Sequence, residues 1–198
     1  MDEKKFDAKK LHKLNNPDRL LDIDSEYIWG KLGVRGSEGL VLVDIGAGTG
    51  FFSIPFLKRS GNGKVFACDI SDVMLEWMRQ NIQPEYPDIM PLKMEEAVVP
   101  LENTVAHVVY MINLHHELED PLELLMESYR ILKNDGAIFV VDWKKEDMDQ
   151  GPPTHLRLLP QQVKNQMLSA GFEDVHIYDG MEKHFLVVAR KFEETAGR

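Results

Sequence analysis

The sequence predicts an α/β protein with a Rossmann-like, doubly wound sheet that is mostly parallel and ends in an antiparallel hairpin strand. From Leu40 onward, short apolar runs alternate with helical patterns, the order typical of a parallel sheet. A turn with glycines at Gly46, Gly48 and Gly50 follows the first run. The last two apolar runs are separated only by residues 179–183, too few for a helical crossover, so they should pair antiparallel.

The expected strands are short, predominantly apolar runs, as suits strands that are covered on both faces. They span residues 40–44, 64–69, 88–94, 105–111, 137–141, 175–178 and 184–189.

Helical patterns fill the intervals between these strands. One carries Phe52, Ile54, Phe56 and Leu57, one follows a Ser71 cap with Val73, Met74, Trp77 and Met78, and one spans 161–170. A further helix over 121–133 should bury Leu122, Leu125, Met126, Tyr129 and Leu132 and close at Asn134-Asp135-Gly136. Before the sheet, Asn16-Pro17-Asp18 predicts a helix start, with Leu20, Leu21, Ile28 and Leu32 as an apolar face.

Composition disfavours several classes of function. The formal net charge of −10 makes nucleic acid an unlikely partner, because phosphate binding needs a surplus of Lys and Arg. No apolar run approaches the roughly 20 residues that cross a bilayer, so we expect no membrane span. With Cys68 as the single cysteine, no internal disulfide can form, and we expect a cytoplasmic protein.

The glycine turn indicates a ligand that the backbone approaches closely. Glycine there allows a sharp turn without a Cβ clash. A dinucleotide fingerprint needs G-x-G-x-x-G, but here Phe51 takes the sixth position and the third glycine comes one residue early. Asp69 ends the second expected strand, where a carboxylate can accept both hydroxyl protons of a ribose, or can simply be a turn residue.

The pattern D-x-G-x-G-x-G at Asp44–Gly50 resembles motif I of the class I S-adenosylmethionine (SAM) dependent methyltransferases. The segment from Asp69 to Leu75 is similar to the family's D-x-S-x-x-M-L, and Lys93-Met94-Glu95-Glu96 to its third-strand end. Within the family the chain most resembles the small type 11 group, which includes ubiquinone and menaquinone methyltransferases. That likeness depends on residues 114–118, 141–145 and 151–153. Ala106-His107 departs from the family, which often has Asp before the fourth strand.

The resemblance implies SAM as cofactor and S-adenosylhomocysteine as product. It implies that the methionine part lies on the glycine loop, that Met74 packs on the adenine, and that Glu95 accepts the adenine amine. The alternative interpretations are that Met74 is ordinary helix core and that the two glutamates are a solvated pair. The predicted cofactor-binding residues are Asp44, Gly46, Ala47, Gly48, Thr49, Gly50, Asp69, Ile70, Met74, Met94, Glu95, Glu96, Met111 and Asn113.

Methyl transfer from a sulfonium needs in-line positioning and exclusion of water, and it needs a base only if the acceptor must lose a proton. His115 and His116 follow the fourth expected strand and are the candidates for that base, or else histidines that fix a loop. Adjacent histidines point in different directions, so we expect no metal site. Asp142-Trp143 and the loop to Leu159 should form a second wall.

We expect residues 1–39 to be an N-terminal helical lid segment and residues 40–198 to be the SAM-binding methyltransferase domain. The expected partner is a small-molecule methyl acceptor. A nucleotide-dependent oxidoreductase and a SAM-binding module without catalysis are the alternatives. Arsenite methylation needs several thiolates and is disfavoured, whereas a quinone precursor could enter past Leu11, Leu14 and Leu20.

Overall fold

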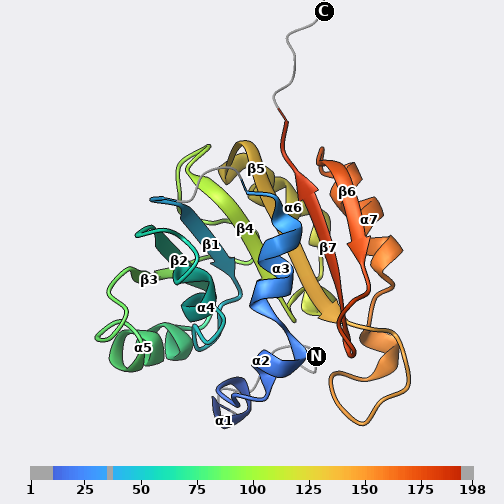
Figure 1. Cartoon of the computed structure of the whole chain (residues 1–198), viewed down its shortest axis with the longest axis horizontal. Helices are drawn as coiled ribbons and strands as arrows, with labels where there is room; N and C mark the ends of the chain where they lie inside the picture. Colours follow the sequence, from blue (N-terminus) through green and yellow to red (C-terminus); the bar gives the residue numbers. More distant parts are fainter. Residues whose placement is uncertain (1–10, 35–37, 193–198) are drawn as a thin grey trace, which may run out of the picture.

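The computed structural model describes residues 11–34 and 38–192 of the chain. Its centre is one sheet with the strand order β3-β2-β1-β4-β5-β7-β6 (Figure 1). β1 to β5 run parallel, and β7 pairs antiparallel with both β5 and β6. The predicted doubly wound sheet with a reversed C-terminal strand is therefore confirmed.

The strands lie close to the predicted runs. Their bounds are β1 Val41–Ile45, β2 Lys64–Asp69, β3 Ile89–Lys93, β4 Ala106–Ile112, β5 Leu132–Trp143, β6 Glu173–Tyr178 and β7 His184–Arg190. The order of the strands reverses between β1 and β4, the place where such sheets bind ligands at their carboxyl ends.

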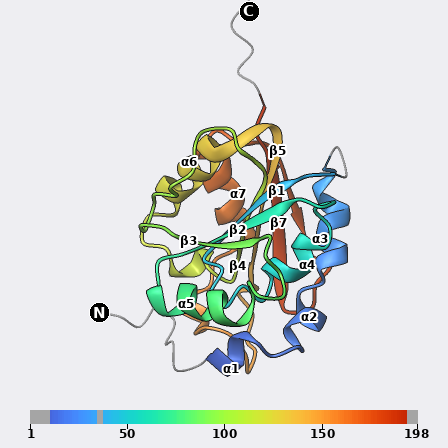
Figure 2. The same cartoon turned by 90° about the vertical axis from the view of Figure 1, so that its left-hand side faces the viewer.

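Two helical layers cover the sheet. α3 (Ser25–Leu32), α4 (Ser53–Leu57) and α5 (Asp72–Asn81) contribute buried side chains to one face. α6 (Pro121–Ile131) and α7 (Pro160–Ser169) cover the other, and Figure 2 shows them across the sheet from α3 and α4. The inner strands β1, β4, β5 and β7 are thus buried on both sides, which explains their continuous apolar runs, whereas the outer strands β3 and β6 are partly exposed.

The sequence misplaced the boundary between α6 and β5. The helix ends at Ile131, and Leu132 already pairs with Ala106 of β4. Leu132 already has an extended backbone, with ψ of 139°, so the helix does not continue to Lys133. The backbone that follows bonds to Lys191 through the amide of Asp135 and the carbonyl of Gly136. Of the predicted closing residues Asn134-Asp135-Gly136, Asp135 has a left-handed backbone, with φ of 61°.

The buried face of α6 is also rotated from the prediction. Leu122 and Met126 are exposed, whereas the helix buries Leu124, Leu125, Ser128 and Ile131. Similarly, Val73 on α5 is exposed.

The segment before the sheet forms short helices: α1 (Leu11–Leu14), α2 (Arg19–Asp22) and α3. Leu20 and Leu21 are exposed, contrary to the prediction, while Ile23, Ile28 and Leu32 are buried against the sheet. α3 has its own start, because the side chain of Asp24 accepts the backbone N–H groups of Glu26 and Tyr27.

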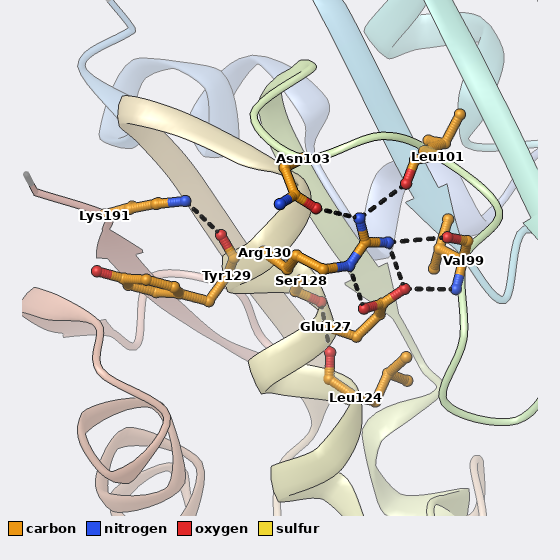
Figure 3. Close-up of polar contacts among 9 residues, drawn as sticks. All are labelled: Val99, Leu101, Asn103, Leu124, Glu127, Ser128, Tyr129, Arg130 and Lys191. Atoms are coloured by element: carbon orange, nitrogen blue, oxygen red, sulfur yellow. Dashed lines mark hydrogen bonds and ion pairs between the residues drawn. The ribbon is translucent and has the colours of Figure 1, made fainter.

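A polar cluster on α6 anchors the loop between β3 and β4 (Figure 3). The Arg130 guanidinium donates to the carbonyls of Val99 and Leu101 and to the Asn103 side chain. It also pairs with Glu127, whose carboxylate accepts the N–H of Val99. The loop that follows Met94 is thereby fixed relative to the end of the sheet.

Candidate active site

A cavity of about 700 Å³ opens at the carboxyl ends of β1, β2 and β4. One wall is the loop after β1, a second comes from the start of α5 and the loop after β3, and a third runs from Asn113 to Leu124. α1 and α2 contribute Leu14 and Arg19. The volume is in the range of small-molecule and cofactor sites.

The glycine loop needs its glycines. Gly46, Gly48 and Gly50 all have positive φ, at 71°, 57° and 73°. A Cβ on Gly46 would lie 2.7 Å from the Leu114 side chain. The amides of Gly46 and Ala47 both donate to the carbonyl of Cys68, so the loop is held against the end of β2.

Asp69 connects this loop to α5. One carboxylate oxygen accepts the Gly48 N–H at 2.7 Å and the other the Ser71 N–H at 2.8 Å. Burial raises the pKa of Asp69, and these backbone bonds and Lys93 oppose the rise. Each oxygen keeps a further lone pair, so the carboxylate can still accept hydroxyl protons from a ligand.

Asp44 lies deeper, at the floor of the cavity. Its side chain accepts the Ser53 hydroxyl at 2.6 Å, and burial raises its pKa to about 7. Arg19 of α2 lies in the same cavity, with its guanidinium 4.6 Å from the Phe52 ring centroid. Burial lowers the pKa of Arg19 to about 10, which leaves it cationic at neutral pH.

Two buried polar atoms of residues that line the cavity lack a hydrogen-bond partner among the described residues. They are the Thr49 hydroxyl and the side-chain oxygen of Asn113. Asn113 also has a φ of 56°, and its backbone N–H donates to the carbonyl of Val141. Because an unpaired buried polar atom costs about 1–3 kcal/mol, both are candidates to bond a ligand.

Most of the predicted cofactor-binding residues line the cavity. These are Asp44, Gly46, Ala47, Gly48, Thr49, Asp69, Ile70, Met74, Met94, Glu96 and Asn113. Gly50, Glu95 and Met111 lie outside the lining. Gly50 faces Met78 and Ile82 of the core, and Met111 is fully buried in β4.

The two histidines after β4 have different partners, and both lie outside the lining of the cavity. His115 is buried, and its Nε2 lies 2.9 Å from the Gln166 side chain. His116 bonds to Asp142 twice: its backbone N–H reaches one oxygen at 2.9 Å and its Nδ1 the other at 2.8 Å. The pKa of His115 is lowered by burial, whereas Asp142 raises that of His116 against its burial.

Residues 142–159, which the structure describes throughout, do not form the expected second wall. The loop folds around Arg157, which donates to the carbonyls of Lys144, Glu146, Gln150 and Pro152. Trp143 packs on His184, with ring centroids 4.2 Å apart.

The predicted site residues did not include five charged residues of the lining, Arg19, Glu117, Glu119, Asp120 and Glu123. Arg19 belongs to a segment without a motif. Glu117 stands next to the histidines that drew attention, and only the 3-10 turn His115–Glu117 shows that the glutamate is the one that faces the cavity.

Comparison with known proteins agrees with this geometry. A family model described as "Methyltransferase domain" matches residues 42–136. A SAM-dependent methyltransferase structure from Aquifex aeolicus is 31% identical, covers 93% of this chain and 98% of its own, and superposes with a TM-score of 0.86.

The names of two curated relatives refer to quinones. The ubiquinone/menaquinone biosynthesis C-methyltransferase UbiE of Ruegeria sp. (strain TM1040) is 29% identical over 109 residues, 54% of this chain. The demethylmenaquinone methyltransferase of Chlamydia muridarum is 29% identical over 104 residues, 51% of this chain. The matched regions cover only 44% and 43% of these relatives. The fold, the glycine-loop cavity and the near full-length match to the Aquifex protein together show that this chain belongs to the class I SAM-dependent methyltransferases.

Proposed function

We propose that this enzyme methylates a small molecule and holds SAM in the cavity between the glycine loop and Asn113. The observation that carries the proposal is the pair of unpartnered buried atoms, Thr49 Oγ1 and Asn113 Oδ1, beside a loop of positive-φ glycines. The Thr49 hydroxyl can donate a hydrogen bond to a carboxylate, and the Asn113 side-chain oxygen can accept one from an ammonium group. A free amino acid moiety carries both.

The remaining lining fits the other parts of SAM. Asp69 is the acceptor for ribose hydroxyls, and Met74 and Met94 offer apolar surface for an adenine. Glu96, which lines the cavity, is placed better than Glu95 to meet the adenine amine. When bound, SAM supplies an electrophilic methyl group, so the protein has mainly to position the acceptor and exclude water.

The lid that we propose is shorter than the predicted lid segment, residues 1–39. Leu14 and Arg19 line the cavity, whereas α3 is part of the core. We therefore assign the covering role to residues 11–22. Residues 1–10 of the expected lid lie outside the described residues. An ion pair of 2.8 Å between Asp22 and Lys183 joins α2 to the start of β7.

A reduced quinone precursor is one acceptor class that these observations favour. The two curated relatives carry quinone-pathway names, and Leu14 lines the cavity together with Phe51, Phe52, Leu118 and Leu124. Of the other predicted entrance residues, Leu20 is 41% exposed and outside the lining. In the described part of the chain, no helix has the length and apolar character to cross a membrane. We propose a cytoplasmic location on the basis of the single cysteine.

The test is turnover of SAM labelled in its methyl group against fractionated cellular metabolites. We expect label to move into a small molecule, identified by its mass, with S-adenosylhomocysteine as co-product. Binding of SAM without turnover in any fraction would favour the non-catalytic module.

A further inference from the structure

Glu117 lies between the open cavity and a buried polar pair. Its side chain lines the cavity and is 27% exposed. Behind it, His116 Nε2 lies 3.7 Å from Glu117 Oε1, and that histidine is only 7% exposed.

Asp142 fixes the orientation of this histidine. The carboxylate of Asp142 accepts a hydrogen bond from His116 Nδ1. It accepts two more from the backbone N–H groups of His116 and Trp143. With Nδ1 bonded to an acceptor, the Nε2 edge of the ring is the one that faces Glu117. The three side chains therefore form a row from the core to the cavity.

The electrostatic surroundings of Glu117 are specific. Burial raises its pKa to about 7; Asp142 and Asp69 add to the rise, and His116 opposes it. Arg157 faces His116 from the loop before α7. Glu119, Asp120 and Glu123 share the same wall, and Arg19 is the only basic residue in the described lining. An anionic acceptor group would be repelled here, while a neutral or cationic one would not.

We propose that Glu117 accepts the proton that the methyl acceptor loses, and that His116 and Asp142 are positioning residues that hold its carboxylate toward the cavity. The acceptor is then a molecule with an O–H or N–H group that binds in its neutral or cationic form. This inference rests on the proposed function.

The step balances without a further reactant. The acceptor attacks the methyl carbon with an electron pair, and the pair of the broken carbon–sulfur bond stays on sulfur. The O–H or N–H bond breaks, its electrons stay on the acceptor, and the proton goes to a Glu117 oxygen. Solvent takes it from there, because Glu117 is partly exposed.

Neither histidine serves as well for this proton. His115 lies outside the lining, and its Nε2 is already bonded to Gln166. His116 reaches the cavity only past Glu117. A carboxylate with a pKa near neutral is also well matched to general base catalysis at neutral pH.

The first experiment compares the wild type with Glu117→Gln, which keeps the shape and removes the charge. The acceptor source is the small-molecule extract used above, together with 1,4-naphthohydroquinone and phenethylamine as defined O–H and N–H probes. We expect kcat to fall about 100-fold, a usual effect of losing a general base, with S-adenosylhomocysteine affinity unchanged. Glu102→Gln removes an equal charge at an exposed site away from the cavity and should behave as the wild type.

The pH profile separates a base from a structural glutamate. The base works only when ionised, so the wild-type rate should rise from pH 6 to pH 8 and level off, and Glu117→Gln should lose this limb. His116→Gln removes the group that lowers the Glu117 pKa, so its limb should move to higher pH. An unchanged rate in Glu117→Gln, or a lower rate with the limb intact, would overturn the proposal.

A readout independent of turnover is the carboxyl carbon resonance of Glu117 in glutamate-labelled protein saturated with S-adenosylhomocysteine. The resonance is identified by its absence in Glu117→Gln. A midpoint near pH 7 is expected, and one near the usual value of about 4.3 would overturn the inference. If the wild type itself turns over no SAM, the proposed function fails and this inference falls with it.

Discussion

At the residue scale, Asp69 accepts backbone bonds from Gly48 and Ser71, and we propose that it also accepts the ribose hydroxyls of SAM. Replacing it with Ala should remove two ribose hydrogen bonds to a charged acceptor, worth roughly 2–4 kcal/mol, so SAM affinity should fall by at least about 30-fold. Because Gly48 and Ser71 also lose their acceptor, some loss of stability should accompany it. Calorimetric titration measures the affinity, and thermal unfolding measures the stability.

Asp72→Ala is the matched control for Asp69. Asp72 stands three residues later and pairs with Lys93 at 2.9 Å, but its side chain is 85% exposed. SAM affinity should be unchanged in this variant. Equal affinity in Asp69→Ala and the wild type would show that the Asp69 carboxylate does not meet the ligand.

Asp44 gives a prediction about pH and stability. Its pKa is about 7 in the fold and near 3.9 in an unfolded chain, so between these values the folded state binds more protons than the unfolded state. The free energy of unfolding therefore decreases, through this group, as the pH rises from about 4 to about 7. Asp44→Asn removes that contribution and keeps an oxygen for Ser53.

The comparison of urea unfolding for wild type and Asp44→Asn tests this. Without ligand, the stability of the variant relative to the wild type should increase between pH 4 and pH 7 and level off above. A difference that is constant with pH would contradict the shifted pKa of Asp44.

At the element scale, α1 and α2 differ from α3. Leu14 and Arg19 line the cavity, and the ion pair of Asp22 with Lys183 is partly exposed, whereas α3 buries Ile28 and Leu32 completely or nearly so. Hydrogen exchange should therefore show residues 11–22 gaining protection when S-adenosylhomocysteine is added, and α3 protected in both states. Equally slow exchange of residues 11–22 without ligand would make them a fixed wall.

The same contrast decides where the chain can be shortened. Removing α1 and α2 should leave the sheet intact but impair methyl transfer, while removing α3 would expose the apolar surface that it covers. The sequence alone did not separate these helices, because Leu20 and Leu21 look as apolar as Ile28.

Elements bounded by polar residues were the easiest to predict. Both ends of β2, Lys64 and Asp69, were predicted correctly, because a glycine precedes the strand and a polar turn follows it. The α6–β5 junction was missed because Ile131 and Leu132 are both buried and apolar, so the chain changes from helix to strand without a local signal. Only the bonds to β4 and Lys191 determine that boundary.

At the scale of the whole molecule, the residues predicted from the sequence cover the glycine-loop side of the cavity lining better than its other walls. The glycine loop and Asp69 follow strands directly, so their positions come with the sheet order. Glu117 and Arg19 reach the cavity through a 3-10 turn and a separate helix, which no periodicity reveals. The predicted base candidates, His115 and His116, follow β4 but lie outside the cavity lining and contact Gln166 and Asp142.

We propose above all that the glycine-loop cavity binds SAM. Calorimetric titration of the purified protein with S-adenosylhomocysteine and, separately, with NAD tests it most directly. We expect saturable binding of S-adenosylhomocysteine at one site per chain and weak or no binding of NAD, because the loop has the D-x-G-x-G-x-G spacing and Asp69, Thr49 and Asn113 line the cavity. Tight binding of NAD without binding of S-adenosylhomocysteine would contradict it.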